Sequence, residues 1–286
     1  MQGKTKQVSP VKLQLNEFVV KISSGADHLA ILANSGVAYT FGSGGTGQLG
    51  RGGRYFSDRG GRRGAAFVLK PAPVRFQTRK NNRLSMNDTA SSSQAFTPRQ
   101  GILTPSQSKN KCLVDDLFCS GLSTFVVSGG KVYTFGLNNY RQLGHGDTDN
   151  KFAPTCSEDY SKYQFKHICG GEHHVIALDN EHNVYAIGRG QDGRCGVVNP
   201  ERAEKEEKHF DEITVLTKLN LPNTEENHVT EISSNGGVGY CCMSDGTGYS
   251  WGFGTNLQKD SEQLGLTVNF VILGCLGFLR FFCDFL

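Results

Sequence analysis

The stretch VYAIGRGQDGRCG, residues 184–196, repeats a pattern that occurs elsewhere in the chain. Its aromatic residue and the glycines that follow recur in AYTFGSGGTGQLG (38–50) and VYTFGLNNYRQLG (132–144), and partly in GYSWGFGTN (248–256). The equivalent aromatic residues are Tyr39, Tyr133, Tyr185 and Tyr249, and the intervals between them vary. Constant spacing inside a unit and variable spacing between units is typical of a repeated supersecondary structure with loop insertions.

Each unit has the composition of a β-hairpin. HLAILANSGVAYTFG (28–42) places an Asn-Ser-Gly turn between two apolar runs, and HHVIALDNEHNVYAIG (173–188) does the same around Asp-Asn-Glu. Helical periodicity is absent from these segments. A sheet of about fifty residues cannot bury both of its faces, so neighbouring units must stack. Strand units of this size repeated around a ring predict an all-β protein, a β-propeller.

The glycines are interpreted as structural residues of the repeat. The chain has 36 glycines in 286 residues, and those at fixed positions fit sites of close backbone approach or positive φ. The glycine-rich run GSGGTGQLG (42–50) also suggests a phosphate-binding loop, but it lacks the Lys-Ser/Thr ending and a following helix. The structural repeat positions are Gly42, Gly50, Gly136, Gly144, Gly188 and Gly196.

Composition narrows the function classes. A formal charge of +3 is too small to argue for nucleic acid binding by itself. The nine cysteines form no CxxC pair, and the polar start MQGKTKQVSPVK is not a secretory signal, so reduced, intracellular cysteines are expected. The eight histidines and nine cysteines show no metal-ligand spacing. We therefore expect neither a metal nor a cofactor.

Several phrases resemble the regulator of chromosome condensation family. They are VVKISSGADHLAIL (19–32), DRGGRRG (58–64), FGLNNYRQLG (135–144) and VGYCCMSDGTGYSWGFGTN (238–256). The resemblance covers roughly residues 8–265, apart from an insert at 77–111. It implies a seven-bladed propeller, with about four to five blades present here, that is a guanine-nucleotide exchange factor for the small nuclear GTPase Ran. It also implies docking on the core histone dimer surface of nucleosomes and a chromatin-associated, nuclear location, while contact with DNA and a cytoplasmic pool stay open. Such a protein performs no covalent chemistry.

The resemblance also sets the expected domain limits. Residues 1–265 form a partial propeller with repeat cores at about 21–52, 116–146, 167–198 and 231–265. The polar insert 77–111 is expected to lack structure. The family's first blades and its protruding β-wedge would precede residue 1, so exchange activity is expected to be poor. The alternative is a propeller that binds histones or another protein without exchange activity. The apolar, non-family tail 266–286 suggests a membrane anchor, but Arg280 and Asp284 argue against one.

The candidate exchange residues lie at a repeat position that varies. The residue before the loop histidine is assigned as Asp27, Ser123, His173 and Gly237 in successive copies, as suits a position that faces a partner. In the family, residues matching Asp27 and His173 support exchange, and one matching Arg51 contacts the GTPase. The alternative is a solvated polar loop residue at each place. His28 and His174, with Thr124 and Val238 as counterparts, are interpreted as structural, bonded to a neighbouring strand's backbone.

A glycine-flanked loop carries Arg59, Arg62 and Arg63. Guanidinium groups suit bidentate capture of carboxylates. The resemblance implies that these arginines enter the acidic patch of the histone dimer. The alternative is a solvated basic loop. The charged run ERAEKEEKHFDE (201–212) is interpreted as a solvated face.

Overall fold

A computed structural model describes residues 10, 12–13, 15–51, 68–74, 76, 113–198, 210–252 and 268–269. Within these ranges the protein is almost entirely β, as predicted, with two single-turn 3-10 helices, η2 (Tyr160–Lys162) and η3 (Gln191–Gly193). The insert at 77–111, the arginine loop and nearly all of the tail lie outside the described residues.

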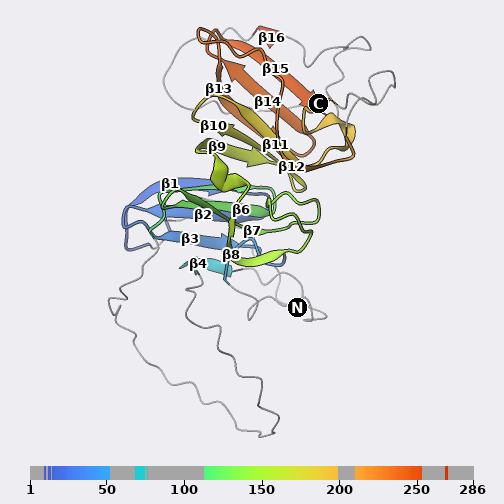
Figure 1. The fold of residues 1–286 in the computed structure, drawn as a ribbon. Coiled ribbons are helices and arrows are strands. Elements are labelled where there is room, and N and C mark those ends of the chain that lie inside the picture. Colours follow the sequence, from blue (N-terminus) through green and yellow to red (C-terminus); the bar gives the residue numbers. More distant parts are fainter. Residues whose placement is uncertain are drawn as a thin grey trace, which may run out of the picture.

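The strands form four sheets, each a meander of four antiparallel strands that follow one another along the chain (Figure 1). Blade 1 contains β1 (Val19–Ser24), β2 (His28–Ala33), β3 (Ala38–Gly42) and β4 (Val68–Pro73). Blade 2 contains β5 (Asp116–Ser120), β6 (Ser123–Ser128), β7 (Lys131–Gly136) and β8 (Lys151–Ser157). Blade 3 contains β9 (Phe165–Gly170), β10 (His174–Asp179), β11 (Val184–Arg189) and β12 (Glu212–Lys218). Blade 4 contains β13 (Val229–Asn235), β14 (Val238–Met243), β15 (Thr247–Gly252) and β16 (Val268–Asn269).

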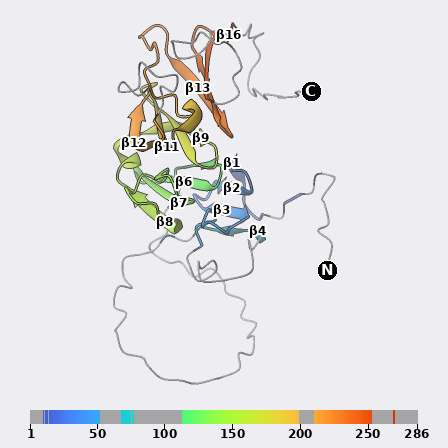
Figure 2. The same ribbon diagram turned by 90° about the vertical axis from the view of Figure 1, so that its right-hand side faces the viewer.

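The blades stand side by side, as the propeller prediction requires. In Figure 2 they follow one another from blue through green and yellow to orange. Successive blades touch through their first strands, β1 with β5, β5 with β9 and β9 with β13. The first strands therefore lie together at one centre, and the second, third and fourth strands of each blade lie successively farther from it. This places the loops between first and second strands around a common rim.

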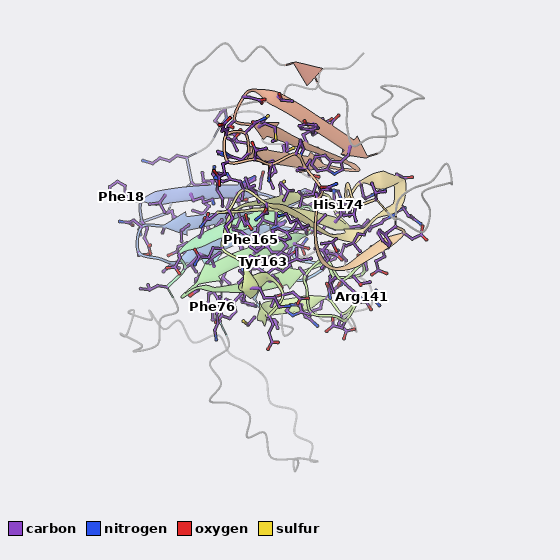
Figure 3. The ribbon with its side chains drawn as sticks, turned by 45° about the horizontal axis from the view of Figure 1, so that its top comes forward. Phe18, Phe76, Arg141, Tyr163, Phe165 and His174 are labelled. Atoms are coloured by element: carbon purple, nitrogen blue, oxygen red, sulfur yellow. The ribbon has the colours of Figure 1, made fainter. Side chains whose placement is uncertain are left out.

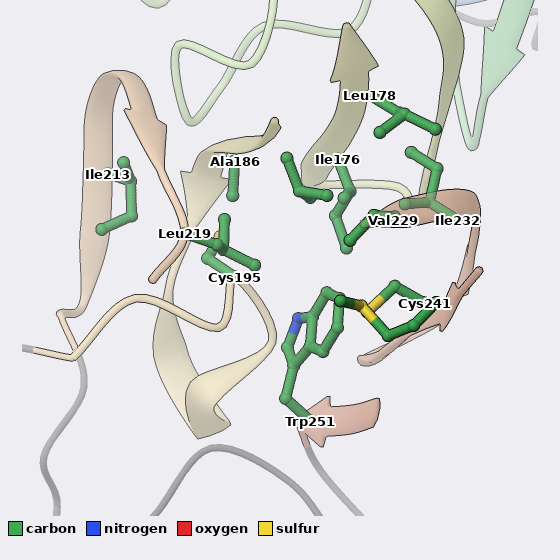
Figure 4. Close-up of a cluster of buried hydrophobic side chains, with 12 residues drawn as sticks. Ile176, Leu178, Ala186, Cys195, Ile213, Leu219, Val229, Ile232, Cys241 and Trp251 are labelled. Carbon is green, nitrogen blue, oxygen red and sulfur yellow. The ribbon is translucent and has the colours of Figure 1, made fainter. Parts of the chain in front are cut away.

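Apolar side chains fill the space between blades. One buried cluster joins blades 1 and 2, a second joins blades 2 and 3, and a third joins blades 3 and 4. Tyr163 and Phe165, labelled in Figure 3, belong to the second cluster. The third places the Trp251 ring of blade 4 beside the blade 3 residues Leu219 and Cys195 (Figure 4). Because each sheet buries an apolar face against the next, burial of that surface stabilises the stack at roughly 25 cal/mol per Å².

The first glycine of the motif lies where a side chain would strike the neighbouring strand. Gly42, Gly136, Gly188 and Gly252 all have φ between 107° and 120°. A Cβ on Gly188 would lie 2.4 Å from the His173 carbonyl oxygen, and one on Gly42 would lie 2.5 Å from that of Asp27. Only glycine combines this positive φ with the close approach of two backbones. The recurring glycine is therefore a packing requirement within each blade.

The second glycine of the motif makes room for an aromatic ring. Gly50 and Gly196, with φ of 63° and 66°, face Phe135 and Trp251 of the next blade. A Cβ there would lie 2.7 Å and 2.9 Å from those rings. Gly144 instead faces Tyr160, in the η2 turn that follows its own blade. The residue before each of these glycines is buried between blades.

The strand register corrects one detail of the repeat alignment. Ser123 pairs with Gly136 as His28 pairs with Gly42 and His174 with Gly188, so Ser123 is the counterpart of the histidines. Asp27 therefore corresponds to Leu122, and not to Ser123. The cause is that the β6–β7 hairpin of blade 2 is one residue shorter and turns tightly at two glycines of positive φ. The loop before β6 has the same length as in the other blades, but its glycine, Gly121, lies one position later than Gly25 does in blade 1.

Candidate functional site

The loops between the first and second strands surround a central hollow of about 680 Å³. Most of its lining residues lie at the end of a first strand or in the loop that follows, and all four blades contribute. The other two are Arg189, the last residue of β11, and Arg194, which comes five residues later. Residues far apart in sequence, such as Gly25, Gly121, Gly171 and Gly236, meet here. The hollow is the place where all blades contribute to one surface, so it is the candidate site for a partner.

Glycines allow the blades to approach at this centre. A Cβ on Gly25 would lie 2.4 Å from the Gly121 carbonyl oxygen, one on Gly121 2.1 Å from that of Gly171, and one on Gly171 2.4 Å from that of Gly236. The Ala26 amide donates to the Gly121 carbonyl at 2.8 Å, which ties blade 1 to blade 2. The rim is therefore held by backbone contacts, and its side chains need not provide the packing.

Asp27 lies on this rim with an exposed side chain, immediately after the lining residue Ala26. Its backbone is held in place, because the Asp27 carbonyl accepts a hydrogen bond from the Ser43 amide at 2.8 Å. The Arg189 amide donates to the His173 carbonyl at 2.8 Å in the same way. Asp27 and His173 therefore occupy equivalent places in blades 1 and 3, at the same end of the second strand.

His173 lines the hollow and is about a quarter exposed. Its Nδ1 lies 3.2 Å from the Asn139 amide oxygen, its ring packs edge-on against Tyr140, and its Nε2 lies 3.8 Å from the Glu172 carboxylate. Partial burial lowers the pKa of His173, Glu172 opposes this, and Arg189 and Arg194 lower it further. Because Nδ1 donates to Asn139, the neutral imidazole presents Nε2 as an acceptor beside the hollow.

Arg51 is anchored away from the hollow. It is half-buried, and its guanidinium donates to the Thr40 carbonyl of its own blade. His145 occupies the matching position in blade 2, where its Nε2 lies 2.8 Å from the Thr134 hydroxyl. The structure thus places Asp27 and His173 at equivalent positions of two blades, and of the three candidates His173 alone is among the residues that line the hollow. The assignment of Arg51 to a contact with the GTPase stays a prediction.

His28 and His174 are buried and bridge neighbouring blades. His174 is labelled in Figure 3. His28 Nε2 lies 2.8 Å from the Thr124 hydroxyl, which itself donates to the Gln48 carbonyl, so Nε2 is the donor. His174 Nε2 donates in the same way to the Ser234 hydroxyl at 2.9 Å. Burial lowers the pKa of both to about 4, so they are neutral. They pack as structural residues, but their partners are hydroxyl groups of the next blade where a strand backbone was expected.

Sequence reasoning missed two arginines that line the hollow. Arg189 occupies the position of Ser43 in blade 1 and Leu137 in blade 2, and Arg194 replaces the buried glutamines Gln48 and Gln142. These are departures from the repeat at positions where the other copies are neutral. A comparison of the copies position by position would have found them.

Arg59, Arg62 and Arg63 lie outside the described residues. Among the residues that the structure describes, no cluster of His, Cys, Asp and Glu could hold a metal ion. No helix in those same ranges has the length and apolar character needed to cross a bilayer.

Known proteins resemble both the sequence and the fold. The family model "Regulator of chromosome condensation (RCC1) repeat" matches residues 129–178, from the start of the β6–β7 turn to β10. The regulators of chromosome condensation of Mus musculus and Homo sapiens are each 34% identical over 261 residues, covering 90% of this chain and 52% of the relative. The chain therefore spans about half the length of the curated relatives it matches.

One solved structure shares the fold. The crystal structure of Prp20p from Saccharomyces cerevisiae, described with its binding properties to Gsp1p and histones, superposes with a TM-score of 0.60. It is 21% identical, and the match covers 87% of this chain and 49% of that protein. At this identity the likeness supports the architecture alone.

Proposed function

We propose that this chain, which belongs to the family of proteins built from regulator of chromosome condensation (RCC1) repeats, promotes guanine-nucleotide exchange on a Ran-type GTPase. The observation that carries the proposal is the rim of the central hollow. Asp27 and His173 reach it from equivalent positions of two blades. In the family, residues matching these two support exchange.

Exchange by such a protein requires no bond making or breaking. A protein that binds the nucleotide-free GTPase more tightly than the loaded form lowers the GTPase's affinity for nucleotide by the same factor. A hundredfold preference corresponds to about 2.7 kcal/mol. Equal affinity for both forms would shift nothing. The rim suits this task because its backbone is rigidly held while its side chains are free to differ from blade to blade.

The second part of the proposal is chromatin docking. Prp20p is described with binding to histones, and the arginine loop with Arg59, Arg62 and Arg63 has the residue type that captures carboxylates in pairs. On this proposal the chain acts in the nucleus, on chromatin. Replacing all three arginines with glutamate should abolish binding to reconstituted nucleosomes and leave nucleotide release from Ran unchanged.

Release of a fluorescent guanine nucleotide from Ran tests the exchange activity. The full chain should accelerate release, and D27A and H173A should each lower the rate at least about tenfold, as loss of a charged hydrogen bond predicts. Both variants should keep nucleosome binding. Absence of acceleration at saturating protein would reject the exchange function.

A non-exchanging interaction module remains the alternative. The chain spans about half the length of its curated relatives, so the activity of the whole relatives is carried to it only as a proposal. Nucleosome binding without any effect on nucleotide release would favour this alternative.

A further inference from the structure

The central hollow carries cationic groups that the proposed function does not use. Arg189 and Arg194 both line it. His173 lines it as well and contacts Asn139 of blade 2. Burial and both arginines lower the pKa of His173, so Arg189 and Arg194 supply the positive charge of this group. Blades 1 and 2 have neutral residues at both arginine positions. The charge is therefore a local addition of blade 3 to the repeat.

Arg189 is held in a fixed orientation. Its Nε donates to the Gln191 side-chain oxygen at 2.8 Å, and its guanidinium lies 5.8 Å from the centre of the Tyr140 ring. Its terminal NH₂ groups make no hydrogen bond with any other residue in the described ranges. A half-buried guanidinium whose far edge has no acceptor is prepared to bind a carboxylate bidentately.

Arg194 supports this arrangement from the side. Its side chain is only 12% exposed, with Nε donating to the Gln191 carbonyl and one NH₂ group to Asp192. Its carbonyl accepts the indole N–H of Trp251 at 3.1 Å. Gln191 thus accepts hydrogen bonds from both arginines. Trp251, the only tryptophan of the chain, contacts Arg194, so its fluorescence can follow binding at this place.

We propose that Arg189, supported by Arg194, forms a subsite in the central hollow for an acidic side chain of the protein that binds this face. The inference deepens the proposed function and takes from it the identity of the partner. An acidic protein segment fits better than a nucleic acid, because Glu172 and Asp192 beside the arginines would repel a continuous row of phosphates while leaving room for a single carboxylate. The net charge of +3 is by itself too small to argue for nucleic acid binding.

Titration of the full chain with a glutamate-rich peptide, followed by Trp251 fluorescence, tests the subsite directly. Binding should saturate, weaken with added salt, and weaken at least about tenfold in R189Q. The matched control is K162Q, which removes one positive charge at a residue that is 63% exposed and paired with Asp159. R189K should be intermediate because it keeps the charge and loses the planar fork.

Two outcomes would overturn the subsite. One is a peptide affinity that is the same in R189Q and K162Q, or no saturable binding at all. The other is tighter binding of an oligodeoxythymidine with the same number of charges, which would assign the site to nucleic acid. Equal unfolding midpoints of R189Q and the unmodified chain exclude misfolding as the cause of a loss.

Nucleotide release from Ran separates this inference from the proposed function. If the chain accelerates release and R189Q requires at least about tenfold more protein for half-maximal effect, both stand. If the chain does not accelerate release but R189Q loses the peptide, the exchange function fails and the subsite stands. If release is accelerated equally by R189Q, the subsite fails alone.

Discussion

Blade 1 and blade 3 follow the same pattern but differ in what their surfaces meet. Ile22 in β1 and Ile168 in β9 hold the same register position, opposite Ile31 and Ala177. Ile168 is 1% exposed against blade 2, whereas Ile22 is 62% exposed. The repeat therefore places an apolar residue at this position of the first strand in both blades. Whether that residue is buried depends on whether another sheet packs against the strand.

The two blades also differ at the rim. Blade 1 places Asp27, Ser43 and Gln48 where blade 3 places His173, Arg189 and Arg194. The core positions between blades keep their apolar character, but these rim positions change charge. Function in a repeat protein is therefore sought where the copies disagree, since packing requires that the other positions agree.

The largest expected effect comes from the glycine shared by both blades. G188A should lower the free energy of unfolding by about 3 kcal/mol or more, because the new Cβ meets the His173 carbonyl at φ 112°. G42A should cost a similar amount. The control G193A has φ 70° but open space around it and should cost about 1 kcal/mol. Urea denaturation measures all three, and equal costs for Gly188 and Gly193 would refute the close-approach argument.

The next largest expected effect separates the exposed Ile22 of blade 1 from the buried Ile168 of blade 3. I168A should destabilise by about 3 kcal/mol, as removal of a buried aliphatic side chain does. I22A should change stability by less than about 1 kcal/mol because the side chain is exposed. Thermal and urea unfolding measure both. A cost at Ile22 as large as that at Ile168 would show that another surface covers β1 in solution.

The buried histidines predict a pH dependence of stability. The pKa of His174 is lowered to about 4 in the folded chain against 6.5 when unfolded, so the unfolded state binds the proton first. Its contribution is complete above about pH 6.5 and is lost as the pH falls toward 4. Between pH 7.5 and pH 5 the loss should be about 2 kcal/mol.

H174Q keeps a donor for Ser234 and should reduce that pH dependence by this amount. Urea unfolding at a series of pH values measures it. An unaltered slope in H174Q would contradict the buried, neutral assignment.

The smallest expected effect is that of returning a rim position to the pattern of the other blades. R194Q should change the free energy of unfolding by about 0.5 kcal/mol at most, because Gln48 and Gln142 satisfy the amide two residues earlier at this position. R194A lacks that acceptor and should cost more. Differential scanning calorimetry resolves the two, and a loss above about 2 kcal/mol in R194Q would make Arg194 a packing residue.

Much of the fold could be predicted because its signals are local. The hairpins, the glycines at 42, 136 and 188, and the stacking of sheets all follow from short-range spacing and from the need to bury apolar faces. The fourth strand of each blade could not be placed, since β4 and β12 pair with the repeat only after long insertions. The offset in blade 2 escaped notice because one missing residue in the β6–β7 hairpin and a glycine placed one position later in the preceding loop mimic a single two-residue deletion.

The sequence by itself determined that the chain forms repeated β-sheets with glycines at their contacts, because backbone sterics and side-chain alternation act within a few residues. Only the tertiary structure decided that Arg189 and Arg194 line one hollow with His173, and that Asp27 follows directly after a residue that lines the same hollow. These residues belong to separate blades, and the distance between them depends on how whole sheets pack around a centre.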